Sequence, residues 1–170
     1  MTQKRWIVLT ALATLAAAIL IFLFSAQQGE DSAHLSGGLT EWLLLRFRPD
    51  FPRLSAQAQA ALLQTWEHIV RKLGHFCEYA LFGACLMSLG YALHRERAFR
   101  LPMLRLWLLA LLYAGSDELH QMFVADRGPA LADVAIDGSG ALAGILFMAA
   151  LLLLRLRWRA AKHSQDDQPL

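Results

Sequence analysis

The chain has 170 residues, a length that suits a single domain. Its residues are 56% hydrophobic and its mean hydropathy is +0.38, values that are high for a soluble domain and favour a membrane protein. The formal net charge is only +2, so charge gives no argument for binding to nucleic acid.

The first predicted element is an uncharged apolar stretch from Trp6 to Phe24, which is long enough to cross a bilayer as a helix. Because Lys4 and Arg5 precede it, a secretory signal peptide is the alternative interpretation. The run is longer than the roughly 7–15 apolar residues of a signal-peptide core, and Phe24 stands where a cleavage site requires a small residue. We therefore expect residues 6–24 to be a retained membrane span.

A mixed segment follows at residues 32–68, and we expect it to form an outer helical segment. Apolar residues recur at helical spacing in "DSAHLSGGLTEWLLLRF", and the two prolines of "RPDFPR" break the chain after it. Ser55 can then cap a second helix. We interpret the segment as amphipathic and lying on the outer membrane face; a lid that contacts a substrate is the alternative.

The second predicted span covers residues 73–93 and opens within the stretch "RKLGHFCEYALFG". Lys72, His75, Glu78 and Tyr79 fall within one third of the helix circumference, because an α-helix repeats every 3.6 residues. The start of this span therefore carries one polar stripe.

The third predicted span covers residues 101–124, which are apolar as far as "AG" and polar afterwards, in "SDELHQ". Asp117, His120 and Gln121 are i, i+3 and i+4 neighbours on one helix face, and Glu118 lies beside that face. The end of this span is therefore polar.

The fourth predicted span covers residues 131–154. Asp133 and Asp137 are i, i+4 neighbours near its start. Gly140 and Gly144 follow on the same face and form a small-xxx-small pattern, which is typical of close helix contact in membranes.

Basic residues predict how these spans are oriented. One cluster precedes the first span, "HRERAFR" separates the second from the third, and "RLRWRAAKH" opens a tail at residues 155–170. With four spans the three clusters fall on one side, which should be the cytoplasm. We expect an all-α, polytopic, single-domain protein with four transmembrane helices, both termini in the cytoplasm and residues 32–68 outside.

This topology brings the polar ends of three spans to one depth near the outer surface. A charged residue at the bilayer centre costs roughly 2.5–3.5 kcal/mol on insertion scales, and side chains nearer the interface still avoid lipid. The ionisable groups should therefore turn inward, pair with one another and form a polar pocket open to the outside. The alternative is structural: Lys72 could pair with Glu78 or Asp117 simply to lock the helices together.

The chain resembles the VanZ-like family of bacterial membrane proteins. Three stretches carry the resemblance, in matching order and spacing: "FSAQQGEDSAHLSGGLTEWL", "RKLGHFCEYALFGACL" and "DELHQMFVADRGPALADVAIDGSGALAG". The family's loop often reads Pro-Gly-Arg where this chain has Ala125-Asp126-Arg127. The resemblance implies a link to glycopeptide antibiotic resistance at the level of the family, and it supplies candidate site residues but no reaction. These candidates are Lys72, His75, Glu78, Tyr79, Asp117, Glu118, His120, Gln121, Arg127, Asp133 and Asp137.

Our first functional hypothesis is an outward-facing intramembrane site that binds an anionic lipid or cell-envelope precursor. Lys72, Arg127 and protonated His75 would hold the phosphate, and Asp133 would orient Arg127. The bilayer and such a lipid are the expected partners, in the bacterial cytoplasmic membrane.

Two further hypotheses come from other classes. The chain could be an intramembrane enzyme, with His75, Glu78, Asp117, Glu118 and His120 as candidate catalytic residues. His75, Asp117, Glu118 and His120 are also metal-ligand types and form the alternative metal site, although "DELH" matches no metal signature, so no metal is predicted; the sequence does not identify a cofactor. The third hypothesis is a structural or accessory membrane subunit.

Overall fold

The computed structural model describes the backbone of residues 2–26, 29–94, 101–123 and 131–166, and the side chains of these residues except 29–35, 101–102 and 163–166. Five α-helices and one short 3₁₀ helix account for nearly all of the described chain, and the described ranges hold no strand. This confirms the prediction of an all-α fold. In chain order the elements are α1 (Gln3–Ser25), α2 (Gly29–Phe47), η1 (Phe51–Arg53), α3 (Ala56–His94), α4 (Leu101–Gln121) and α5 (Leu131–Asp166).

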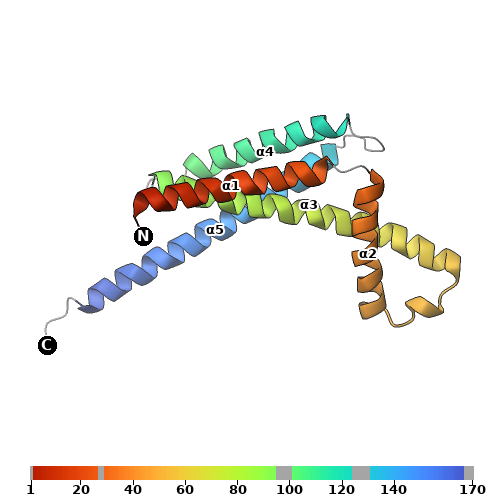
Figure 1. The fold of residues 1–170 in the computed structure, drawn as a ribbon. Helices are drawn as coiled ribbons and strands as arrows, with labels where there is room; N and C mark the ends of the chain where they lie inside the picture. Colours follow the sequence, from red (N-terminus) through yellow and green to blue (C-terminus); the bar gives the residue numbers. More distant parts are fainter. Residues whose placement is uncertain (1, 27–28, 95–100, 124–130, 167–170) are drawn as a thin grey trace.

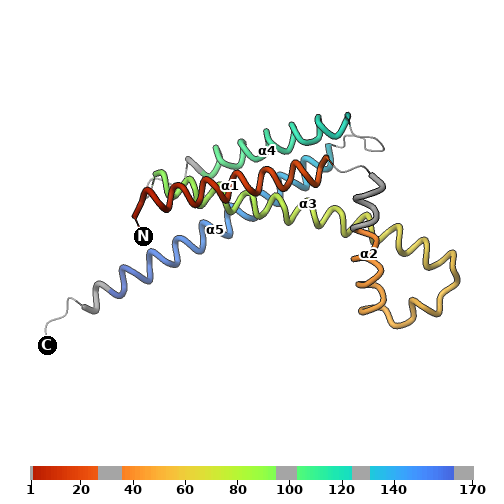
Figure 2. Tube along the Cα trace, viewed as in Figure 1, coloured from red at the N-terminus to blue at the C-terminus, as the bar shows by residue number. Residues whose placement is uncertain are grey.

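Four of the helices run side by side in alternating directions (Figure 1). The most extensive contact is between α3 and α5, and α1 and α4 lie against this pair. α2 runs across the bundle at one end and packs on α3. Figure 2 shows the resulting path: the end of α1, the start of α5 and the end of α4 all meet at the end of the bundle near α2.

Three helices are long and apolar enough to cross a membrane, judged by the length and composition of the described residues. They are α1, α3 and the Leu131–Lys162 part of α5. The sequence predicts four such spans, and three of them are supported by the structure. α4, the expected third span, does not qualify because Arg105, Asp117 and Glu118 interrupt its apolar sequence.

The outer segment and the second span are not separate helices, contrary to the boundary predicted between residues 68 and 73. The chain does break around η1, and Ser55 Oγ accepts a hydrogen bond from the Ala58 amide at 3.3 Å, as the predicted cap requires. From Ala56 onward, however, α3 continues for 39 residues. Such a helix is about 58 Å long, roughly twice the thickness of a hydrocarbon core.

The predicted cytoplasmic tail also begins as helix. α5 passes residue 155 without a break and ends at Asp166, after 36 residues. Arginine, lysine and alanine are good helix formers, so the basic sequence after residue 154 extends the helix instead of ending it.

α3 and α5 approach each other closely along a line of small residues. A Cβ atom added at Gly140 would overlap the backbone of Phe76, and one added at Gly144 would overlap the backbone of Ala80. Gly83 meets the backbone of Ala141 in the same way from the α3 side. The small-xxx-small prediction is thus confirmed, because only glycine permits this contact.

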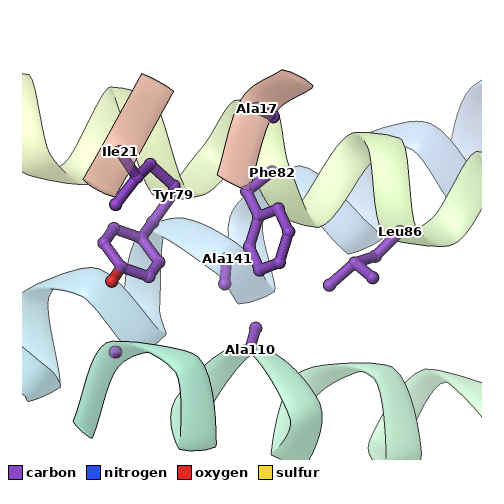
Figure 3. Packing of buried hydrophobic residues seen from close by; sticks show 8 residues of the cluster. Ala17, Ile21, Tyr79, Phe82, Leu86, Ala110 and Ala141 are labelled. Atoms are coloured by element: carbon purple, nitrogen blue, oxygen red, sulfur yellow. The ribbon is translucent and has the colours of Figure 1, made fainter. Parts of the chain in front are cut away.

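Beside this crossing lies a core of buried apolar and aromatic side chains from four helices (Figure 3). Tyr79 and Phe82 of α3 pack edge to face, with ring centroids 6.4 Å apart. Ile21 of α1 and Ala110 of α4 lie on either side of them. This core supports the polar groups that lie one to two turns further along the same helices.

Candidate functional site

Ionisable and polar side chains of four helices form one connected cluster at the end of the bundle near α2, and we call it the polar end. Its members are linked by ion pairs, hydrogen bonds or direct electrostatic interaction. They are Ser25 of α1; Lys72, His75, Glu78 and Tyr79 of α3; Asp117, Glu118, His120 and Gln121 of α4; and Asp133 and Asp137 of α5. The structure therefore brings together all of the predicted site residues that it describes.

Two contacts between a basic and an acidic side chain connect α3 to α5 at the polar end, and we call both of them ion pairs, the second being charged only when His75 is protonated. Lys72 pairs with Asp133, and His75 Nδ1 lies 3.7 Å from Asp137 Oδ1. The spacing explains both contacts: Lys72 and His75 are three residues apart on one helix, and Asp133 and Asp137 are four apart on the other. The two pairs follow one another along the α3–α5 interface.

These two pairs differ in depth. The side chains of Lys72 and Asp133 are 26% and 16% exposed, whereas Asp137 is completely buried. The lysine therefore lies at the rim of the polar end, and the second pair lies inside it. The structure corrects the expected pairing of Lys72 with Glu78 or Asp117, because Asp133 is the carboxylate that binds the ammonium group.

α1 contributes a residue that the sequence analysis missed. Gln121 Nε2 donates hydrogen bonds to Ser25 Oγ at 2.9 Å and to Asp117 Oδ2 at 3.3 Å. All three side chains are buried. Ser25 directly follows the last apolar residue of the first predicted span, at the span end that the predicted topology brings to the depth of the other polar residues. This position was the signal in the sequence that could have identified Ser25.

Buried polar atoms of Tyr79 and Asp137 make no hydrogen bond within the described part of the chain. These atoms are the Tyr79 hydroxyl and both carboxylate oxygens of Asp137. The Tyr79 hydroxyl points between α4 and α5 (Figure 3) and interacts electrostatically with Asp117 and Asp137. Unsatisfied buried polar atoms are rare in native structures and commonly mark a functional position.

Carboxylates predominate inside the polar end. Asp137 lies within electrostatic reach of Glu78, Asp117, Glu118 and Asp133. Asp117 interacts in turn with His75 and His120. The interior of the polar end is therefore acidic, and its lysine stands at the edge.

His120 also stacks on Phe22 of α1, with ring centroids 4.8 Å apart. Within the described residues, no group of three or more His, Cys, Asp or Glu side chains is arranged to hold a metal ion. The alternative ligand set of His75, Asp117, Glu118 and His120 is thus not assembled as such a group.

Arg127 lies outside the described residues, in the connection between α4 and α5. Its predicted contact with Asp133 is therefore not tested. The structure does show that Asp133 is already engaged by Lys72.

Comparison with known proteins adds one finding. The model of the VanZ/LLP1 family matches residues 10–154, which include every helix except the start of α1 and the end of α5. The comparisons with curated proteins and with solved structures give no match.

Proposed function

Because the chain belongs to the VanZ/LLP1 family, we propose that it is a multi-pass protein of the bacterial cytoplasmic membrane whose polar end faces outward and binds the headgroup of an anionic lipid or cell-envelope precursor. The observation that carries the proposal is the position of Lys72. It is a cation at the rim of a buried polar cluster, held by one partly exposed carboxylate.

A phosphate can compete for this cation. Both the phosphate and the Asp133 carboxylate accept charge-assisted hydrogen bonds from an ammonium group, so a headgroup that reaches the rim can replace Asp133 on Lys72. The buried acids behind the rim would exclude the phosphate from the interior. Arg127, in the connection that precedes α5, supplies a second cation and the planar fork suited to phosphate.

We further propose that α4 is the fourth membrane span. It lies in the bundle beside α3 and α5. Asp117 and Glu118 are buried against the other helices, while Leu104, Leu108 and Leu112 are exposed at helical spacing. The middle of the surface that α4 would present to lipid is therefore apolar, and its exposed charge, Arg105, lies near the start of the helix, at the end away from the polar end.

The headgroup proposal is tested by lipid binding in nanodiscs. We expect wild type to bind anionic lipids, including a polyprenyl phosphate, more tightly than uncharged lipids of matched chains. Lys72→Met should lower this preference about tenfold, the effect of losing one charge-assisted contact. Arg127→Lys should lower binding despite its unchanged charge, because it removes the planar fork.

Lys4→Met provides the matched control, because Lys4 is an exposed lysine at the opposite end of the bundle. Equal binding by wild type and both site variants, or copurification of uncharged lipids alone, would refute the headgroup proposal. If headgroup binding protects an envelope precursor, expression of the protein should also lower sensitivity to a glycopeptide antibiotic.

A structural role is the second candidate, because both ion pairs of the polar end join the same two helices. In that case, variants of the polar end should lower the amount of folded protein in parallel with any loss of function. A binding role instead predicts loss of function at a normal protein level.

A further inference from the structure

A second site lies outside the polar end, in the hairpin made by α2 and the first part of α3. A pocket of about 360 Å³ opens between these helices, a volume typical of small-molecule sites. Leu43, Leu44 and Phe47 of α2 line one wall, and Trp66 and Val70 of α3 line the other. The lining is predominantly apolar and suits a hydrocarbon chain.

Two polar residues enter this lining, Arg48, which pairs with Asp50, and Thr40. Thr40 is 1% exposed, and its hydroxyl makes no hydrogen bond within the described part of the chain. Thr10, Thr14 and Thr65 all bond the backbone carbonyl four residues earlier, as threonines in helices commonly do. Thr40 departs from this pattern, so its hydroxyl is available to a ligand that carries an acceptor.

The pocket is next to the rim of the polar end. Val70 precedes Lys72 by two residues, which corresponds to about 3 Å along the helix axis but about 200° around it, so the two side chains leave α3 on different faces. Ser36, one turn before Thr40 on α2, donates a hydrogen bond to Glu67 of α3 at 3.3 Å, and Glu67 pairs with Arg71. The Thr40 end of the pocket therefore lies near the level of Lys72 along α3, and a headgroup would reach Lys72 around the side of the helix.

The hairpin also presents apolar side chains on its outside. Leu39, Trp42 and Leu45 of α2 are exposed, and α2 runs across the bundle axis beside the polar end (Figure 1). A helix in this position lies along the surface of a bilayer that surrounds the bundle, where acyl chains and headgroups meet. A membrane lipid is thus the ligand with direct access to the pocket.

We propose that the α2–α3 pocket binds one acyl chain of a glycerophospholipid, with the Thr40 hydroxyl donating to the ester carbonyl. The acyl chain would lie in the apolar pocket, the ester carbonyl at the buried Thr40 hydroxyl and the headgroup toward Lys72, at the end of the pocket away from Arg48. The contact of its phosphate with Lys72 rests on the proposed function, whereas chain binding by the pocket does not.

The test uses full-length protein in nanodiscs and a phosphatidylglycerol that carries a photoreactive group in one acyl chain. Crosslinks mapped by mass spectrometry should fall on the pocket walls, within residues 40–47 of α2 and 66–70 of α3. Leu44→Trp fills the pocket and should lower crosslinking and binding about tenfold, the effect of losing contact with about two methylene groups. Leu45→Trp is the matched control, because Leu45 is 52% exposed and Leu44 is 5% exposed on the same helix.

Thr40→Val keeps the size of the side chain and removes the donor, so it tests the pocket even if Leu44→Trp fails to fold. It should lower binding of the ester-linked lipid and leave binding of an ether-linked analogue, which has no carbonyl, unchanged. Equal losses for both lipids would refute the role of Thr40.

The outcomes separate this proposal from the headgroup proposal. If Lys72→Met abolishes the preference for anionic lipids while Leu44→Trp binds and crosslinks like wild type, the pocket proposal is wrong and the headgroup site stands. If neither wild type nor Lys72→Met prefers anionic lipids but crosslinks in the pocket persist, the pocket proposal is supported and the headgroup proposal is wrong. Crosslinks confined to lipid-facing leucines of α1 and α4, or between two copies of the chain at the pocket, would overturn the proposal.

Discussion

The pair formed by Lys72 and Asp133 shows what single residues contribute at the polar end. Both side chains are mostly withdrawn from solvent, so removing one partner leaves the other with a desolvated charge. Because neither is fully buried, we expect each single variant, Lys72→Met or Asp133→Asn, to lower the free energy of unfolding by about 1–2 kcal/mol, less than for a fully buried pair.

The double variant should recover most of that loss, because it leaves no unpaired charge. Unfolding in detergent checks this prediction. The double variant Lys72→Met with Glu78→Gln serves as the comparison for Lys72→Met with Asp133→Asn, because the structure places Lys72 on Asp133 instead of Glu78. If the Lys72 and Asp133 effects add to within about 0.5 kcal/mol, the two residues are not coupled.

At the residue scale, the sequence correctly predicted which charged residues gather at the polar end. It did not predict that Lys72 pairs with Asp133. Helical periodicity and alternating direction are enough to bring residues 72–79, 117–121 and 133–137 to one depth. Pairing depends on how far each helix is rotated about its own axis, and a rotation of one residue changes the partner. Ser25 was missed for a related reason: a serine carries no charge, so nothing in its sequence context demands a partner.

At the scale of elements, the crossing of α3 and α5 depends on glycine. Gly144→Ala would place a methyl group on the backbone carbonyl of Ala80. We expect a loss of about 1–3 kcal/mol in the free energy of unfolding, because backbone cannot move aside as a flexible side chain can. Both ion pairs of the polar end bridge these same helices, so Gly144→Ala should also weaken them.

Gly115→Ala is the control for this substitution. Nothing lies within 4 Å of a Cβ atom added at Gly115, which is also in a helix. There the change should be neutral or should stabilise the protein by up to about 1 kcal/mol, because alanine favours helix. Similar melting temperatures for the two variants would show that the close crossing is not required.

The sequence predicted the glycine contact but not the length of the helices that make it. Its small-xxx-small spacing is a local pattern that directly specifies a close approach. The continuity of α3 has no such local marker, because the change from amphipathic to apolar sequence near residue 70 occurs without proline or a new cap. A helix can pass from one environment to another without a change in its backbone hydrogen bonds. The break expected near residue 70 therefore does not occur.

At the scale of the whole molecule, the alternating directions of α1, α3, α4 and α5 place both chain ends on the side of the bundle opposite the polar end (Figure 1). With three basic clusters on that same side, the orientation rule predicts cytoplasmic termini. A reporter active only in the cytoplasm should be active when fused after Leu170 and inactive when inserted near Pro49.

The reverse reporter pattern would place the polar end on the cytoplasmic side and exclude an outer-leaflet ligand. Activity at both positions would show that an even number of the three helices between Pro49 and Leu170 crosses the membrane, which would remove α4 from the spans. Hydropathy alone does not decide between three and four spans. Two of the three charged residues that interrupt α4, Asp117 and Glu118, are covered by the other helices, whereas Arg105 near the start of α4 is exposed.

The uninterrupted helix α3 has a mechanical consequence. Its first sixteen residues, about 24 Å, extend beyond Lys72, and the rest passes through the bundle without a break. A continuous helix bends only gently, so the hairpin and the bundle share one stiff element that is held against α5 at the glycine crossing. A force that tilts the Ala56 end of α3 would therefore reach the His94 end through the helix itself, without a separate transmitting domain.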